Sequence, residues 1–200
     1  MEPWQNFAIE NIKKYPFISL NWQGYEDELK AHNDVDSYIQ YYIDSGSAQL
    51  FALLSMTFKP NIIVEFGTAM GIRTHLLWRL NPNASIYTVE PLETVRSDGN
   101  YPAGYVAKIN HASVTYIKDF SYATNIQNVN FCYIDADHSE ESVYRDSLLA
   151  WKNRNTSQDW VILWDDYPLG SVAKAVNRFV SEVNVPLQGM GHVFIANRIL

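Results

Sequence analysis

The chain has 200 residues, 47% of them hydrophobic and 18% charged, so it can form one globular domain with a substantial core. The formal charge of −7 excludes broad electrostatic binding to nucleic acid, because a phosphate backbone requires a basic surface. The single cysteine, Cys132, excludes a disulfide framework within the chain and is typical of a reducing compartment.

The amino terminus has neither a basic segment nor a long apolar run, and no apolar stretch approaches the roughly 20 residues of a membrane span. We therefore expect a cytoplasmic protein that binds no membrane. Residues 1–58 mix aromatic and acidic residues and are expected to form a helical cap, a lid over the substrate. Within them, residues 48–58 predict an apolar helix that ends at Lys59-Pro60. Residues 59–200 are expected to form the main compact unit.

Short apolar runs alternate with helical periods from Asn61 onward, which predicts a parallel sheet covered by helices on both faces. The segment after Ser139 begins with Glu140 and Glu141, and this arrangement predicts a helix with Ser139 as its N-cap. The predicted strands are 61–66, 84–91, 113–119, 130–135 and 160–166, and a closing strand at 192–199 for which both the parallel and the antiparallel orientation are open. The predicted helices are 71–80, 139–153 and 170–183.

Each predicted helix has an apolar face that we expect to pack on the sheet. These inward residues are Ile72, Leu76 and Leu80 in the first helix, Tyr144, Leu148 and Trp151 in the second, and Val172, Val176, Phe179 and Val180 in the third.

Acidic residues follow the predicted strands where each strand ends. Because the carboxyl ends of parallel strands share one edge, and ligands bind there, we expect a site at this edge. The residues that indicate it are Glu65, Glu90, Asp135, Asp137, Asp165 and Asp166.

The segment VEFGTAMG, residues 64–71, places glycines between a strand and a helix, where they allow close backbone approach and leave helix N–H groups for a ligand. It is neither the G-x-G-x-x-G dinucleotide fingerprint nor a P-loop, and a plain turn is the alternative. Glu90 ends the next strand, where a carboxylate can accept hydrogen bonds from a ribose diol. A solvated strand-end charge is the alternative for Glu90.

Asp135, Asp165 and Asp166 bring three carboxylates to neighbouring strand ends, where they repel one another unless a cation lies between them. A hard divalent ion such as Mg²⁺ fits such oxygen ligands. In the alternative, Asp166 caps the helix that begins near Gly170 and Asp165 pairs with a base. His138 is the one histidine in acidic company, whereas His32, His75, His111 and His192 are expected to be surface or packing residues.

The segments IIVEFGTAMGIRT, YTVEP, YIDADHSEESVYRDSLLAW and VILWDDYPLGSVAKAVNRF together resemble a class I S-adenosylmethionine-dependent methyltransferase. The resemblance covers about residues 48–200 and is closest to the macrocin-type O-methyltransferases of the methyltransferase domain 24 group. It implies a Rossmann-like α/β fold: a seven-stranded, mostly parallel sheet with helices on both faces, behind the N-terminal helical cap.

The resemblance also implies roles for individual residues. Asp135, Asp165 and Asp166 would hold Mg²⁺, and Asp137 would be the catalytic base. In related catechol-type enzymes a lysine acts as base, and His138 occupies the matching position, so His138 is the second candidate. The cofactor residues would be Glu65, Gly67, Thr68, Gly71, Glu90 and Asp135, with Asp119 near the adenine.

The function that we expect is O-methyl transfer from S-adenosylmethionine to a hydroxyl of a small molecule, assisted by Mg²⁺. A dehydrogenase on a Rossmann-like sheet, a non-catalytic cofactor-binding or regulatory module, and a hydroxylase-like relative are the alternatives. The partner that we expect is a small-molecule acceptor of unassigned identity. Both a monomer and a homo-oligomer are compatible with the sequence.

Overall fold

The computed structural model describes residues 47–95, 101–190 and 192–197. The chain divides into two compact units, residues 1–53 with residue 200 and residues 54–199. Helix α4 (Ser47–Phe58) matches the helix expected at residues 48–58. The remainder of the expected cap, residues 1–46, lies outside the described residues, and the lid therefore stays a prediction.

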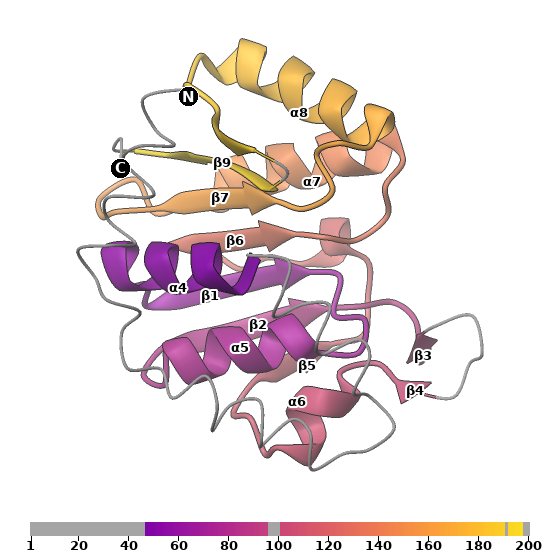
Figure 1. The fold of residues 1–200 in the computed structure, drawn as a ribbon. Coiled ribbons are helices and arrows are strands. Elements are labelled where there is room, and N and C mark those ends of the chain that lie inside the picture. The colour runs from indigo at the N-terminus through magenta and orange to yellow at the C-terminus, as the bar shows by residue number, and fades with distance from the viewer. Residues whose placement is uncertain (1–46, 96–100, 191, 198–200) are drawn as a thin grey trace. The chain divides into compact units, whose positions relative to one another are not determined.

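The second unit contains a seven-stranded sheet with the strand order β5-β2-β1-β6-β7-β9-β8 (Figure 1). The first five strands in this order pair in parallel, and β9 pairs antiparallel with both β7 and β8, which confirms the expected Rossmann-like, mostly parallel sheet. The strands are β1 (Ile62–Phe66), β2 (Ser85–Val89), β5 (Thr115–Ile117), β6 (Phe131–Ile134), β7 (Val161–Trp164), β8 (Gln188–Met190) and β9 (His192–Ala196).

The strand order reverses beside β1. From β1 the chain moves outward through β2 to β5, and then returns to place β6 on the other side of β1. In a parallel sheet this reversal leaves a crevice at the carboxyl ends of the strands. The residues that follow β1 and β6 are therefore positioned to meet a ligand.

Helices cover both faces of the sheet. Helix α5 (Ile72–Leu80) lies on one face, where its Thr74 hydroxyl donates a hydrogen bond to Glu65 of β1. Helices α7 (Glu140–Asn153) and α8 (Gly170–Val183) pack on the other face, together with one set of alternate strand residues. Burial of apolar area between these layers supplies the main stabilising free energy. The buried cluster includes Val64, Phe66, Cys132, Ile134, Ile162, Trp164, Val172, Val176 and Phe179.

The inner face of α7 differs from the sequence prediction. Leu148 is 40% exposed, so its expected inward position was wrong, and Tyr144 and Trp151 are only partly buried. The buried face carries small and polar residues instead, because the large Trp164 ring of β7 fills the space beneath it. The indole Nε1 of Trp164 donates to the Ser147 hydroxyl at 2.9 Å.

Helix α8 follows its prediction in range and in the burial of Val172, Val176 and Phe179, while Val180 is partly buried. In α5, Leu80 is only partly buried and Thr74, His75 and Leu77 are buried in addition to Ile72 and Leu76.

Several short elements were not expected from the sequence. They are the hairpin of β3 (Thr94–Val95) and β4 (Tyr101–Pro102), helix α6 (Tyr105–Ile109), the 3₁₀ turn η1 (Ser121–Ala123) and β8. No helix in the described part of the chain combines the length and the apolar character needed to cross a membrane.

Candidate active site

The carboxyl ends of β1, β6 and β7 are aligned in register. Phe66, Ile134 and Trp164 are direct partners across the three strands, so the next residue of each strand reaches the same edge. The amide of Asp135 donates to the carbonyl of Phe66 at 2.8 Å, and the amide of Asp165 donates to that of Ile134 at 3.1 Å. The two aspartates are therefore neighbours, as the strand pattern predicted.

The glycine loop packs against protein backbone. Gly67 has φ +93°, and a Cβ there would lie 2.0 Å from the carbonyl oxygen of Asp135. Gly71, the N-cap of α5 at φ +79°, approaches Gly104, whose Cα would lie 2.8 Å from an added Cβ. These glycines are required by contacts between loops, a reason that the sequence alone did not indicate. Thr68 is buried, with its hydroxyl 2.6 Å from that of Thr88.

Glu65 is buried beneath this loop. The Thr74 hydroxyl donates to its carboxylate, and the Thr88 hydroxyl does so at 2.6 Å. Burial raises the pKa of Glu65 to about 7, although the two threonine hydrogen bonds oppose that shift. Glu65 is thus an internal carboxyl group, and its side chain organises β1, β2 and α5.

Glu90 follows β2 and joins it to the glycine loop. Its carboxylate accepts hydrogen bonds from the amides of Ala69 at 3.3 Å and Leu92 at 3.2 Å. The side chain is half-buried, so oxygen lone pairs stay accessible beside the loop. This position suits the ribose contact expected from the sequence.

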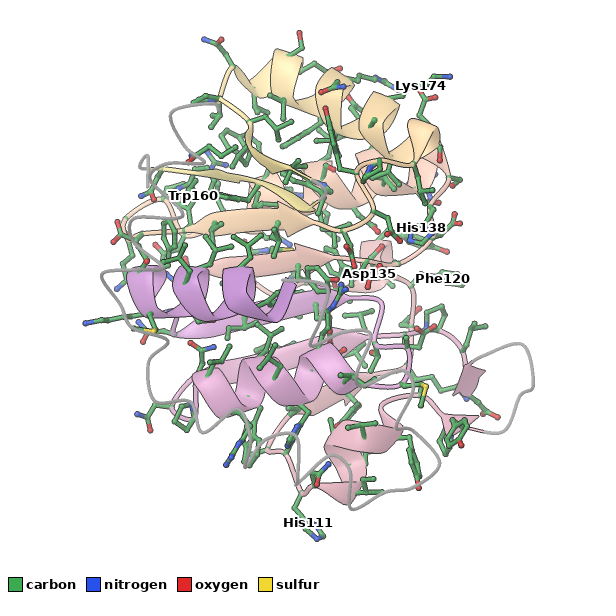
Figure 2. All side chains as sticks on the ribbon, in the orientation of Figure 1. His111, Phe120, Asp135, His138, Trp160 and Lys174 are labelled. Carbon is green, nitrogen blue, oxygen red and sulfur yellow. The ribbon has the colours of Figure 1, made fainter. Side chains whose placement is uncertain are left out.

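Asp119 lies beyond β5 and is exposed; its carboxylate accepts a hydrogen bond from the Phe120 amide at 2.8 Å. The ring of Phe120 stacks on that of Tyr122 with centroids 5.3 Å apart, and both rings are more than half exposed. Figure 2 shows Phe120 on the same side of the molecule as Asp135 and His138.

Asp135 and Asp165 share a cation from within the chain. Arg73 of α5 forms ion pairs with both carboxylates, and its guanidinium lies 5.1 Å from the centre of the Tyr133 ring. The Tyr133 hydroxyl donates to Asp165 Oδ2 at 2.7 Å and lies 3.0 Å from Asp135 Oδ2. The alternative in which Asp165 pairs with a base is therefore confirmed. Arg73 was not expected in this site from the sequence, where its position in the first turn after the glycine loop was the available signal.

Asp166 and the second oxygen of Asp135, Oδ1, both lie near the imidazole of His138. His138 Nε2 lies 3.6 Å from Asp135 Oδ1 and 3.4 Å from Asp166 Oδ2. The side chain of Asp166 does not cap α8, whose N-cap is Leu169 without a side-chain hydrogen bond. That part of the alternative reading was wrong. Among the described residues, the acidic and histidine side chains placed to hold a metal ion together are Asp135, His138 and Asp166.

The titration of these groups follows from their surroundings. Burial raises the pKa of Asp135 above its usual value, and the nearby charges of Asp165 and Asp166 add to this shift, while His138 and Arg73 oppose it. The contact with Asp135 raises the pKa of His138.

Asp137 points to solvent and is held by the next helix. Its carboxylate accepts a hydrogen bond from the Ser139 hydroxyl at 2.6 Å, and this bond lowers its pKa. Ser139 is the N-cap of α7, as predicted, and accepts a hydrogen bond from the Ser142 amide. The other histidines fit the packing and surface expectation where they are described: His75 is buried in α5 and His111 is exposed. His32 and the side chain of His192 lie outside the described residues.

A buried hydroxyl beside the glycine loop offers a further contact. Tyr116 Oη is buried and has no hydrogen-bond partner among the described residues. Its ring contacts Gly104, which in turn packs on Gly71. Burial, with the charge of Glu65 adding to it, raises the pKa of Tyr116 to about 12. An unsatisfied buried hydroxyl is costly, so a polar ligand atom at this place would be stabilising.

Comparisons with known proteins agree with this geometry. The family model described as "methyltransferase domain" matches residues 64–167, which is more than half of the chain. A search of curated proteins finds no match.

Solved structures share the fold at low sequence identity. The Streptomyces achromogenes O-methyltransferase TomG, in complex with S-adenosylmethionine, is 13% identical with a TM-score of 0.56 over 76% of this chain and 80% of that one. A Bacillus cereus O-methyltransferase, in complex with S-adenosylhomocysteine, is 16% identical with a TM-score of 0.55 over 75% and 79%. The Podospora anserina methyltransferase PaMTH1, also bound to S-adenosylhomocysteine, is 13% identical with a TM-score of 0.57 over 77% and 78%.

The matched residues run from β1 through the glycine loop to the end of β7 and so include the carboxyl ends of β1, β2, β5, β6 and β7. The chain therefore belongs to the methyltransferase domain family, as the resemblance of its motifs predicted.

Proposed function

We propose that this chain transfers the methyl group of S-adenosylmethionine to a hydroxyl oxygen of a small molecule, assisted by a divalent cation. One observation carries the proposal: the loop joined to Glu90 and the carboxylates of Asp135 and Asp166 meet at one edge of the sheet. The S. achromogenes and B. cereus structures, which are described as complexes with S-adenosylmethionine and S-adenosylhomocysteine, support the choice of cofactor.

The residues of the loop fit the cofactor. Glu90 offers carboxylate oxygens to a ribose diol, and the unsatisfied Tyr116 hydroxyl offers a buried polar contact nearby. We assign Gly67, Thr68 and Gly71 to shaping this loop and Asp119, with its exposed carboxylate, to the adenine side. Glu65 supports the loop from below through Thr88.

The acids at the end of β6 and β7 fit a divalent cation through the oxygens that Arg73 leaves available. Such a cation lowers the pKa of an acceptor hydroxyl. The sequence-based ligand set is Asp135, Asp165 and Asp166. Asp135 and Asp166 are the more accessible members, since Asp165 is buried against Arg73.

Asp137 is our choice for the group that takes the acceptor proton. Its carboxylate is exposed at the same edge, but its hydrogen bond from Ser139 makes it a weak base. A weak base suits an acceptor hydroxyl that a cation has already made acidic. His138 is the second choice, because its imidazole lies between two carboxylates.

Residues 1–58 are proposed to cover the acceptor as a lid, and the acceptor itself is proposed only as a small hydroxyl compound. A non-catalytic cofactor-binding module or a hydroxylase-like relative would share the loop contacts, so turnover is the property that separates them.

The cofactor test compares binding of S-adenosylhomocysteine by calorimetry and by thermal shift. We expect the wild type to bind, and Glu90→Ala to bind about tenfold or more weakly, because a hydrogen bond to a charged group contributes about 1.5–3 kcal/mol. NAD⁺ is expected to give no shift.

Glu93→Ala is the matched control, since Glu93 is an exposed acid of the same segment that pairs with Lys118. It should bind like the wild type. Absence of binding by the wild type at millimolar ligand, or binding of NAD⁺ in its place, would reject the methyltransferase proposal. Incubation with S-adenosylmethionine and hydroxyl compounds then separates an enzyme from a binding module, because only an enzyme releases S-adenosylhomocysteine together with a methylated acceptor.

A further inference from the structure

Helix α7 carries an acidic residue on the face that it buries. The structure describes this helix throughout, and its buried residues are Val143, Asp146, Ser147, Ala150 and Asn153. Asp146 is only 4% exposed. A carboxylate on the buried face of a helix costs folding free energy, and a neutral residue of similar shape would avoid that cost. Packing alone therefore does not account for an aspartate at this position.

The surroundings of Asp146 oppose its charge. Burial raises the pKa of Asp146 to about 6; the Ser121 hydrogen bond and the charge of Arg145 oppose this shift, and the charge of Asp137 adds to it. On β6, the charge of Asp146 adds to the rise that burial causes in the pKa of the Cys132 thiol. At neutral pH the folded protein thus holds a buried charged group, and this lowers its stability.

Asp146 accepts a hydrogen bond from another element. The hydroxyl of Ser121, the first residue of the 3₁₀ turn η1, donates to Oδ1 of Asp146. The neighbouring residues also meet, because the Arg145 guanidinium lies 5.6 Å from the centre of the Tyr122 ring. The Tyr122 ring in turn stacks on that of Phe120, with the ring planes 8° apart. Side chains of α7 thus hold η1 in place, and the hydrogen bond to the buried carboxylate is the stronger of the two contacts.

The turn η1 directly follows the residues that we assign to the adenine side of the cofactor. Asp119 and Phe120 come immediately before Ser121, and Phe120 is the extended N-cap of η1. The Glu90 amide donates to the carbonyl of Ile117 at 3.0 Å, so the end of β5 lies beside the residue proposed for the ribose. A shift of η1 would therefore move the Asp119 carboxylate relative to Glu90.

We infer that Asp146 is a positioning residue for the cofactor: through the Ser121 hydroxyl it fixes η1, and it thereby holds the Asp119 carboxylate where it can accept a hydrogen bond from the adenine amino group. This inference rests on the proposed function, because it requires the adenine to lie beside Asp119. The burial of Asp146 lowers stability, while the fixed turn requires less ordering when the ligand binds. The first turn of the same helix holds Asp137 through Ser139, so α7 orients groups on both the cofactor side and the acceptor side.

The test is calorimetric binding of S-adenosylhomocysteine and of S-inosylhomocysteine, in which a keto oxygen replaces the amino group of the purine. A fixed Asp119 carboxylate accepts from the amino group and repels the keto oxygen, so the wild type should prefer S-adenosylhomocysteine by about tenfold or more. Ser121→Ala and Asp146→Ala should each weaken its binding by about fivefold to tenfold and should lose most of this preference. The double variant should bind like the single ones, because both substitutions remove the same hydrogen bond.

Thermal stability separates positioning from packing. Asp146→Asn keeps an acceptor oxygen for Ser121 and removes the charge. It should therefore melt at a higher temperature than the wild type at pH 8, with a smaller gain at pH 4, and should retain the preference between the two ligands. Tyr144→Phe is the matched control, since it removes a 2.6 Å hydroxyl–carboxylate hydrogen bond that joins α7 to Glu182 of α8. It should leave both affinities as in the wild type.

Wild-type affinity and preference in folded Ser121→Ala and Asp146→Ala would overturn the inference, as would an equal loss in Tyr144→Phe. Additive losses in the double variant would show that the two residues act independently, and equal binding of both ligands by the wild type would show that Asp119 does not read the amino group; either result also overturns it. The proposed function stands in each of these cases, because the wild type binds S-adenosylhomocysteine. Absence of that binding would reject the proposed function and the inference together.

Discussion

Gly67 lies directly against the backbone of Asp135: a Cβ at Gly67 would stand 2.0 Å from the Asp135 carbonyl oxygen and 2.5 Å from its carbonyl carbon. The amide of Asp135 in turn donates to the carbonyl of Phe66. The loop after β1 and the end of β6 are thus fitted to each other at backbone level. The position of the Asp135 carboxylate therefore depends on the absence of a side chain at residue 67.

Gly67→Ala is expected to lower the free energy of unfolding by more than about 2 kcal/mol, because the clash is with backbone and φ is +93°. Gly170→Ala is the matched control, since an added Cβ there meets nothing within 4 Å at the start of α8. It should be neutral or stabilising by up to about 1 kcal/mol. Urea denaturation measures both variants. Equal stabilities would show that the loop can move away from Asp135 at little cost.

Arg73→Met should destabilise the protein by about 3–5 kcal/mol at pH 7, because it leaves the buried Asp165 and its neighbour Asp135 without their cation. The loss should shrink at pH 5, because Arg73 opposes the raised pKa of Asp135, and without Arg73 this carboxyl group takes up a proton more readily and no longer repels Asp165. Chemical denaturation at the two pH values measures this change. Arg178→Met, which removes a half-exposed ion pair with Glu182, should cost less than about 1 kcal/mol. Similar costs for the two variants would contradict the network.

Glu65 should make stability depend on pH between its ordinary pKa of 4.5 and its raised pKa of about 7. Its contribution is present in full below 4.5 and is lost as the pH rises through 7, because the folded protein then holds a buried charge. Relative to the wild type, Glu65→Gln should therefore gain about 3 kcal/mol of stability between pH 4 and pH 8. The comparison cancels the opposite contribution of His75, whose pKa is lowered to about 4, because both proteins contain it. A constant difference across this range would show that Glu65 titrates normally.

The pH profile of methyl transfer separates the two candidate bases. If Asp137 accepts the proton, turnover should stay level from pH 8 down to about pH 5, because its pKa lies below the ordinary 3.8. Asp137→Asn should then reduce kcat by about 10²-fold or more. If His138 is the base, turnover should fall below a pKa that lies above 6.5. If turnover falls in this way at low pH, is lost in His138→Gln and is kept in Asp137→Asn, then His138 and not Asp137 is the base.

Much of the fold could be predicted because local patterns record it. The alternation from Asn61 onward predicted the parallel strands, and Ser139 with its two following acids marked the start of α7. Leu148 was assigned to the wrong face because the helical spacing of apolar residues does not report how much space lies between the helix and the sheet. Ser147 takes the inward position through its hydrogen bond with Trp164, a contact between elements that a sequence window does not contain.

The sequence by itself determined which chemical groups reach the edge of the sheet, because a residue that follows a parallel strand must emerge at its carboxyl end. The strand pattern predicted that Asp135, Asp165 and Asp166 lie at this edge. It did not indicate which partner each carboxylate contacts. The tertiary structure decided their partners. Arg73 lies 62 and 92 residues from the two aspartates that it pairs with, and the packing of α5 on the sheet brings its guanidinium to them. Charge neutralisation acts over a few ångströms in space, whereas sequence patterns report neighbours along the chain, and so only the fold could separate Asp165 from the group of Asp135, His138 and Asp166.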